Sequence, residues 1–299
     1  MKRLWMFLLC TLAVIFLARN TPLRAAAAEG LALCAGSVIP ALFPFMVTSS
    51  MLISLGFGTL LSPLLAPLMA LYRLPGQAGT AVVLGLVGGY PIGAKTAARL
   101  RAEGRLTRSE GERLLTFCNN SGPVFLISVL GEGIFGSFRA GVYLWLIHLL
   151  SALLAGLLLR GREGTDLRAP PPPLAQGSEI FLSAAFVSAV RESSLTMVSV
   201  CGFVVFFYVL SRPLRLLPPP LSLAAVGAVE LFSMTPLVTP DRLGFTLASA
   251  LTAFGGLSVL CQSAAALDGS GLSPVSLVKG KALQGLLAGA LAFLLWPVL

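Results

Sequence analysis

The stretch that decides the fold runs from Gly85 to Phe125. It reads GLVGGYPIGAKTAARL (85–100), RAEGRLTRSEGERLL (101–115) and TFCNNSGPVF (116–125). Two apolar segments flank a charged one, and both are interrupted by glycine, proline or small polar residues. Glycine and proline break a helix and expose backbone polar groups, which lipid cannot hydrogen-bond. The pattern predicts broken helices at membrane depth that face protein or a solvated cavity, as is typical of a solute site.

The composition indicates a polytopic membrane protein. The chain has 299 residues, of which 56% are hydrophobic and 11% charged, whereas a soluble domain carries about 25% charged residues. The formal charge of +9 lies in short loops between apolar runs, which is information on topology rather than the mark of a nucleic-acid surface. The five cysteines are scattered singly, which argues against a disulfide framework or a zinc site. His148 is interpreted as an interior or interfacial residue.

Apolar runs predict the membrane spans. Residues 4–18 are expected to form a retained first helix, followed by a loop, LRAAAAEG (23–30); a cleaved secretory signal is the alternative. The short segments 59–72 and 78–94 form either two tilted spans or a re-entrant hairpin. The other apolar segments are residues 31–57, 114–130, 140–159, 180–210, 221–238, 244–267 and 282–299.

These spans predict one all-α integral membrane domain, residues 1–299, built from two repeats. The first repeat is 31–159, the second is 180–299, and a proline-rich cytoplasmic linker, 160–179, joins them. Each repeat has a long helix, a broken segment and a helix interrupted by small residues. An odd number of crossings separates the two starts, so the repeats are inverted. Inverted repeats with broken helices place a substrate site near the bilayer midplane.

Basic residues predict the orientation. An N-terminus inside the cell places 95–113, read as a loop or amphipathic segment, and the linker on the cytoplasmic face, in line with the positive-inside rule. The basic residues of this half that then lie outside are Arg19, Arg24, Arg73 and Arg139, and the side of Arg73 stays open because of the possible hairpin.

Five motifs in a fixed order carry a resemblance. They are SVIPALFPFMV (37–47), GYPIGAK (89–95), FCNNSGP (117–123), VELFSMTPL (229–237) and AFGGLSVLCQSAAAL (253–267). The chain resembles the YlbJ (SpoVV) family of sporulation integral membrane proteins. These belong to the gate or nucleoside-recognition membrane domains and are similar to halves of concentrative nucleoside transporters. The resemblance implies transport of dipicolinic acid from the mother cell toward the forespore, across the bacterial cell membrane or the outer forespore membrane.

The candidate residues of the site have polar or charged groups within apolar sequence. Lys95, next to glycine-exposed amides, suits an anion site, or else it reaches the membrane interface. Glu230 lies in an apolar run, where a carboxylate is a functional candidate. The hydroxyl and amide groups either bind solute or join helices. The full set is Tyr90, Gly93, Lys95, Asn119, Asn120, Ser121, Glu230, Ser233, Thr235, Ser258 and Gln262.

The function that fits these features is transport of a small anionic solute. GGYPIGAKT differs from a phosphate-binding loop because Ala94 precedes Lys95, and no catalytic or metal-ligating set stands out, so neither an enzyme nor a cofactor is expected. The rings of Tyr90, Phe117 and Phe125 are expected to contact a planar solute. The alternatives are a nucleoside transporter and a non-transporting scaffold of a sporulation complex. The partners expected are the solute and the lipid bilayer, and a homo-oligomer stays open.

Overall fold

The structure is a computed structural model that describes residues 20–161 and 182–296, together with residues 6, 10, 11 and 14. These residues form helices and turns and no β-strand. Five helical segments are long and apolar enough to cross a membrane, which confirms the all-α, polytopic prediction. The five segments are Thr21–Ser54, Phe138–Leu158, Leu182–Leu216, Arg242–Ala265 and Pro274–Leu295.

The first long helix begins earlier than predicted. It comprises α2 (Asn20–Leu33), a π-helical turn η1 (Cys34–Val38) and α3 (Ile39–Ser54). The prediction of a loop over residues 23–30 is wrong. The four alanines of LRAAAAEG favour a helix, and they lie inside α2. Most of the predicted helix 4–18 and nearly all of the linker 160–179 lie outside the described residues.

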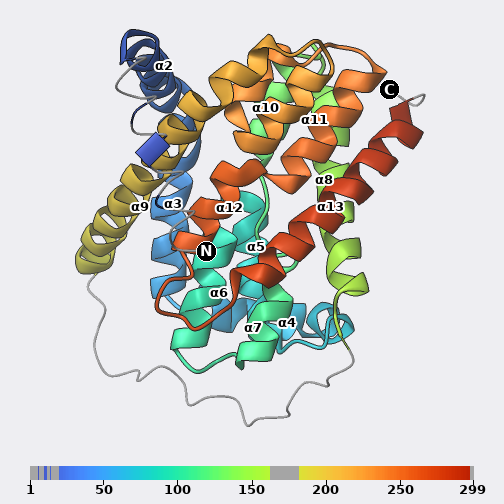
Figure 1. Cartoon of the computed structure of the whole chain (residues 1–299). Helices are drawn as coiled ribbons and strands as arrows, with labels where there is room; N and C mark the ends of the chain where they lie inside the picture. Colours follow the sequence, from blue (N-terminus) through green and yellow to red (C-terminus); the bar gives the residue numbers. More distant parts are fainter. Residues whose placement is uncertain (1–5, 7–9, 12–13, 15–19, 162–181, 297–299) are drawn as a thin grey trace.

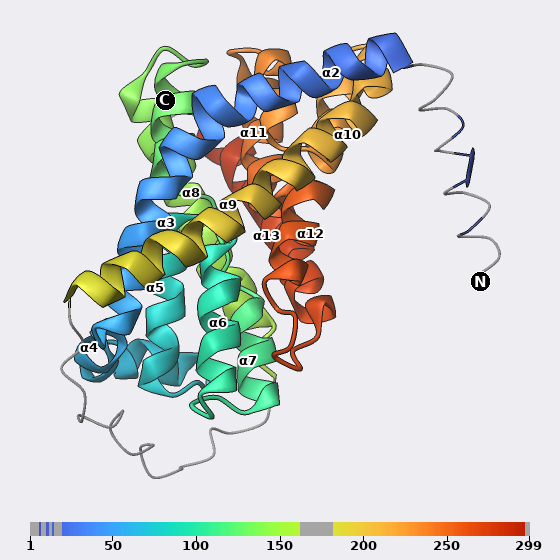
Figure 2. The same cartoon turned by 90° about the vertical axis from the view of Figure 1, so that its left-hand side faces the viewer.

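The two short segments that follow form a cross-piece and a hairpin. Helix α4 (Phe57–Leu71) lies at the lower end of the molecule in both views (Figures 1 and 2). The turn η2 (Gly76–Ala78) leads into α5 (Gly79–Gly88). The chain reverses direction after α5, and the next helix, α6 (Ile92–Ala102), packs against α5. Residues 79–102 therefore form a helical hairpin with its tip at Gly89-Tyr90-Pro91, whereas the predicted hairpin paired 59–72 with 78–94.

The charged patch is helical rather than a loop. Its first part belongs to α6 and its second to α7 (Arg108–Leu115), where the Thr107 side chain accepts the Glu110 N–H and the Glu110 side chain accepts the Thr107 N–H. Such a capping box is worth about 1 kcal/mol. An interruption at residues 116–124 then separates α7 from a π-helical segment. The first half ends with that segment, η3 (Phe125–Glu132), and α8 (Phe138–Leu158).

The second half has the same order of parts. The predicted span 221–238 is a pair, α10 and η5, that breaks at Glu230, and 244–267 is α11 and α12 with the break at Gly255. Asp241 caps α11 by accepting the Gly244 N–H at 2.7 Å, and this hydrogen bond lowers the pKa of Asp241. The elements are α9 (Leu182–Ser211), η4 (Arg212–Leu216), α10 (Leu221–Val229), η5 (Phe232–Leu237), α11 (Arg242–Phe254), α12 (Gly256–Ala265) and α13 (Pro274–Leu295).

The two halves run in opposite directions. In Figure 1, α3 and α8 run toward the lower end, whereas α9 starts there and rises, and α13 ends near the top. Helix α3 packs against α9, and α8 packs against α13, so equivalent helices of the two halves meet. This arrangement supports the predicted inverted repeat.

Arg73, whose side the possible hairpin left open, lies at the same end of the molecule as the basic residues of segment 95–113. Its guanidinium donates to the carbonyl of Gly161 at 3.0 Å, and its own carbonyl accepts from Arg113 at 3.2 Å. Arg160 donates to the carbonyl of Leu71 at this same end. The α5–α6 hairpin starts and ends at this end of the molecule, so the chain does not cross to the opposite face after α4. Arg73 therefore adds to the excess of basic residues at this end.

Candidate solute site

A cavity of about 70 Å³ lies where the interruptions of the helices meet. Its wall takes residues from the tip of the α5–α6 hairpin, from the break before η3, from the break before η5 and from α12. Side chains of η1 and α3 complete it. Among the lining residues are Tyr90, Ser121, Gly122, Phe125, Phe232, Thr235 and Gln262. In the part of the chain that the structure describes, no charged side chain lines this cavity.

Four of the predicted site residues line the cavity, namely Tyr90, Ser121, Thr235 and Gln262. Two of them are fixed by hydrogen bonds directed away from it. The Tyr90 hydroxyl donates to the carbonyl of Thr252 at 2.7 Å. The Gln262 amide nitrogen donates to the Ser258 hydroxyl at 3.1 Å, so Ser258 supports a lining residue and is not itself part of the wall.

His148 holds the break between α7 and η3 from behind. It is buried on α8, and its Nε2 accepts the backbone N–H of Ser121 at 3.1 Å. Since that bond needs a lone pair on Nε2, the ring proton of a neutral His148 is on Nδ1. The histidine is thus an interior residue that orients Ser121 toward the cavity.

The asparagines do not line the cavity, and their side chains join helices, which is the second of the two roles expected for them. The Asn119 Oδ1 accepts the N–H of Ala94 at 3.2 Å, and its Nδ2 donates to the Ser263 hydroxyl at 2.7 Å. The Asn120 Nδ2 donates to the carbonyl of Phe117 at 2.7 Å. Their amides satisfy backbone groups that the break leaves without helical partners.

Gly93 and Phe117 have packing roles instead of the predicted contact with solute. A Cβ atom on Gly93 would lie 2.0 Å from the carbonyl oxygen of Cys118, so only glycine lets the hairpin approach the neighbouring break. Phe117 stacks on Tyr72 with the ring centroids 4.4 Å apart. Of the three predicted rings, Tyr90 and Phe125 line the cavity, and Phe232 joins them with its centroid 5.1 Å from that of Phe125.

Glu230 is fully buried next to the cavity but does not line it. Its Oε2 accepts the backbone N–H of Ser233 at 2.5 Å, which closes the turn from α10 into η5. Within the described chain, its Oε1 and the Ser233 hydroxyl have no hydrogen-bond partner. Arg215 approaches the same turn, since its Nη2 donates to the carbonyl of Ser233 at 3.2 Å. Glu230 and Ser233 therefore stabilise the turn between α10 and η5, which we call the second hairpin, and do not line the cavity.

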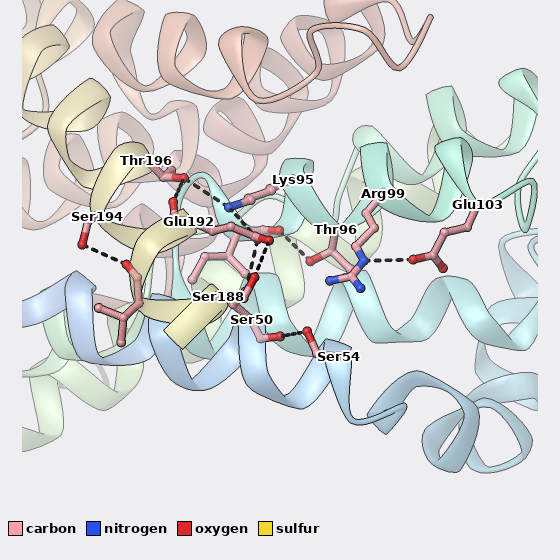
Figure 3. A network of polar contacts seen from close by, with 12 residues as sticks. Ser50, Ser54, Lys95, Thr96, Arg99, Glu103, Ser188, Glu192, Ser194 and Thr196 are labelled. Carbon is pink, nitrogen blue, oxygen red and sulfur yellow. Dashed lines mark hydrogen bonds and ion pairs between the residues drawn. The ribbon is translucent and has the colours of Figure 1, made fainter. Parts of the chain in front are cut away.

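Lys95 lies outside the cavity, in a polar network between α6, α3 and α9 (Figure 3). Its Nζ donates to the Thr196 hydroxyl at 3.1 Å and is 3.8 Å from a carboxylate oxygen of Glu192. Ser50 and Ser188 also donate to Glu192, both at 3.4 Å. The lysine is thus occupied by a partner on the long helix α9.

A groove of about 270 Å³ lies next to Lys95 and borders the cavity. Lys95 and Thr196 line it, and Gln262 belongs to both the groove and the cavity. The hairpin tip is likewise shared, with Tyr90 on the cavity side and Pro91 on the groove side. Gln262 and the hairpin tip therefore form the partition between the groove and the cavity.

Sequence reasoning missed Lys281, the buried lysine of α13, which is 1% exposed. Its Nζ donates to the carbonyl of Asn119 at 2.8 Å and to Gln284 Oε1 at 2.6 Å, and it lies 5.0 Å from the centroid of the Tyr90 ring. The Gln284 amide donates in turn to Asn120 Oδ1 at 3.1 Å and to the carbonyl of His148 at 3.2 Å.

The error comes from the start of α13, which the apolar run places at residue 282 and which lies at Pro274. A signal is present, because Ser273 followed by Pro274 is a typical helix start. From there, Lys281 is seven residues into a 22-residue apolar helix, roughly 10 Å along its axis. Gly280 makes the contact possible, since a Cβ atom on it would be 2.1 Å from the carbonyl oxygen of Thr116.

The described residues hold no group of three or more His, Cys, Asp or Glu side chains that could bind a metal ion. The site instead offers aromatic rings, amides and hydroxyls around the cavity, with one ammonium group behind the Tyr90 ring. Such a set suits a small planar molecule with hydrogen-bonding groups.

Known proteins show the family. A family model described as "Gate: Nucleoside recognition" matches residues 35–155, which lie within the first half. The chain is 31% identical over 319 aligned residues to the sporulation integral membrane protein YlbJ of Bacillus subtilis (strain 168), covering 92% of this chain and 78% of that protein. No solved structure matches. The chain thus belongs to the YlbJ family of sporulation integral membrane proteins and is itself a multi-pass membrane protein.

Proposed function

We propose that this protein transports a small anionic aromatic solute, with dipicolinate as the first candidate, from the mother cell toward the forespore. The observation that supports it most is the single cavity wall built from interruptions in both halves. In transporters made of inverted repeats, the substrate lies at such a meeting point of broken helices. A rocking of one half against the other would expose the cavity to each side in turn.

The lining of the cavity suits a planar ring with polar substituents. Tyr90, Phe125 and Phe232 supply aromatic surface, while Ser121 and Gln262 supply groups that donate and accept hydrogen bonds. No carboxylate of the described chain lines the wall, so an anion meets no like charge there. The ammonium group of Lys281 lies behind this wall, 5.0 Å from the centroid of the Tyr90 ring.

Nucleoside transport is the second candidate, and the description of the matching family model favours it. A nucleoside also has a planar ring and hydrogen-bonding groups, but it carries no charge to match Lys281. A non-transporting scaffold is a third function, in which the cavity would have no role in solute movement.

Uptake into proteoliposomes discriminates the three. Purified full-length protein is reconstituted, and entry of radiolabelled dipicolinate and uridine is compared with protein-free liposomes. We expect dipicolinate to enter and uridine to stay outside. Entry of uridine alone would favour the nucleoside transporter, and entry of neither would favour the scaffold.

A matched pair of glycine variants ties uptake to the cavity. Gly122 lines it, and no atom is closer than 3.6 Å to the position that a Cβ on this residue would take, so Gly122→Leu adds a side chain at the wall with its Cβ in ordinary contact. Gly202→Leu adds the same side chain on α9, where nothing lies within 4 Å. We expect Gly122→Leu to abolish uptake and Gly202→Leu to retain it, and equal uptake by both would argue against this cavity.

A further inference from the structure

The ammonium group of Lys281 is buried, and no opposite charge lies beside it. All its near partners are neutral: the Asn119 carbonyl, the Gln284 amide and the face of the Tyr90 ring. Within residues 20–161 and 182–296, no carboxylate forms an ion pair with it. An ionisable side chain at membrane depth is costly and marks a functional position by default.

A structural role does not need this charge. The two acceptors of Lys281 would be satisfied by a neutral donor, and burying an ammonium group without a counter-ion is unfavourable. A solute anion that enters and leaves the site would be the missing counter-ion and would explain why a lysine is present here. The Tyr90 ring links the ammonium group to the cavity, since it contacts the lysine and also lines the cavity.

We propose that Lys281 binds a carboxylate group of the solute and that Tyr90 covers the lysine while the site is empty. This inference rests on the proposed transport of an anion. Tyr90 is at the tip of the α5–α6 hairpin and Lys281 is on α13 of the other half. An anion that displaces the Tyr90 ring from the ammonium group therefore contacts both halves. The relative position of the halves then depends on whether a charged solute is bound.

The ammonium group of Lys281 is held in place by an ordered network. Gln284 accepts from it and links it to the Asn120 side chain and to His148. A compact ammonium group in a fixed position can bind one carboxylate oxygen as a point charge.

Three variants of the full-length protein test the proposal. Lys281→Met removes the charge and keeps much of the side-chain length. Gln284→Glu keeps the lysine but places a carboxylate where Gln284 Oε1 now lies 2.6 Å from Nζ, so it neutralises the site from within. Lys279→Met is the matched control, because it removes the same charge from an exposed position on the same helix.

Binding of two ligands of equal shape is measured on purified protein by calorimetry. The ligands are pyridine-2,6-dicarboxylate and its neutral counterpart, pyridine-2,6-dicarboxamide. We expect Lys281→Met and Gln284→Glu to weaken dicarboxylate binding by about tenfold or more, as for loss of a buried charge partner, with the dicarboxamide affinity changed by less than about threefold. Lys279→Met should bind both like the parent.

The outcomes separate this inference from the proposed function. A parent that binds dipicolinate and charge variants that bind it equally well overturn the role of Lys281 alone. Equal loss of both ligands in both charge variants, with normal elution from size-exclusion chromatography, shows a structural lysine and also overturns it. A parent that neither binds nor transports dipicolinate overturns the proposed function, and this inference with it.

Discussion

Lys281 and Lys95 both lie near the interrupted helices, yet their surroundings differ in one decisive respect. The Lys95 side chain is 37% exposed and has a carboxylate partner, Glu192, across the α6–α9 contact. Lys281 is buried, and its partners are a carbonyl, an amide and a ring. A lysine whose charge is already balanced can join two helices, whereas one without a counter-ion is suited to a charged ligand.

The two lysines also lie at two different spaces, the groove and the cavity. Lys95 lines the groove beyond the partition, while Lys281 lies behind the wall of the cavity, and Gln262 belongs to both spaces. We expect Lys95 to act on the opening between the groove and the cavity, and Lys281 on the affinity of the bound solute. The two lysines should therefore affect different kinetic constants.

The largest effect is expected where the backbone around Lys281 is tightest. Gly280→Ala places a methyl group 2.1 Å from the Thr116 carbonyl oxygen, which forces α13 away from the break. Strain of this kind destabilises a fold by about 1–3 kcal/mol or more. Thermal unfolding in detergent should show a lower Tm and loss of dipicolinate binding.

Gly202→Ala is the control for Gly280→Ala, because no atom lies within 4 Å of a Cβ at that position of α9. Replacing glycine by alanine inside a helix gains up to about 1 kcal/mol, so this variant should match or exceed the parent in Tm. A Gly280→Ala protein as stable as the parent would show that α13 does not need this close approach, and the placement of Lys281 would lose its support.

Asn119→Ala should have the next largest effect. It removes the side chain that accepts from the Ala94 N–H and donates to Ser263, while leaving the carbonyl that binds Lys281. A buried donor left unpaired costs about 1–3 kcal/mol. We expect a lower Tm and reduced dipicolinate uptake, with protein still present in the membrane.

Asn119→Asp is the informative comparison for Asn119→Ala. It keeps an acceptor for the Ala94 N–H but brings a negative charge next to the break whose carbonyl binds Lys281. We expect it to lower dipicolinate affinity more than it lowers Tm. A variant that binds dipicolinate like the parent would indicate that charge near Lys281 does not matter.

Glu230→Gln should have a small effect on stability. The glutamine keeps an oxygen to accept the Ser233 N–H, so the turn is expected to persist with a change below about 1 kcal/mol. If the carboxylate takes part in proton or cation coupling, uptake by the variant should lose its dependence on pH or cation. Uptake that keeps the parental dependence on both would reduce Glu230 to a structural residue of the second hairpin.

Local pattern predicts where the helices break, because glycine, proline and small polar residues act within a few residues of their position. The tip at Gly89-Tyr90-Pro91 and the break at 116–124 follow from such clusters, whereas the break expected at Pro236 lies at Glu230 instead. Of the predicted residues, those at or near these breaks, such as Tyr90 and Ser121, do line the cavity.

Long-range partners are beyond local pattern. Whether Lys95 faces solute or the interface depends on Glu192, which is far away in sequence. Lys281 escapes detection because the apolar window places the start of α13 too late, even though the Ser273-Pro274 signal is readable. That the lysine meets the break at Asn119 depends on the packing of α13 against α7, which only the three-dimensional arrangement shows.

The smallest effect is expected for the ion pair of Lys95, and it tests the other side of the comparison. Both partners are substantially exposed, at 37% and 50%, so solvent screens the pair and its coupling energy should be only about 0.2–1 kcal/mol. Lys95→Ala, Glu192→Gln and the double variant form a double-mutant cycle, and their Tm values give this coupling energy.

In transport, we expect Lys95→Ala to impair dipicolinate uptake by changing the maximal rate, while the affinity for dipicolinate stays near that of the parent. Because the contact joins the hairpin to α9, Glu192→Gln should change the rate in the same direction, and raising the salt concentration should reduce the difference from the parent. A Lys95→Ala protein whose main defect is weak dipicolinate binding would place Lys95 in the binding site and remove the distinction between the two lysines.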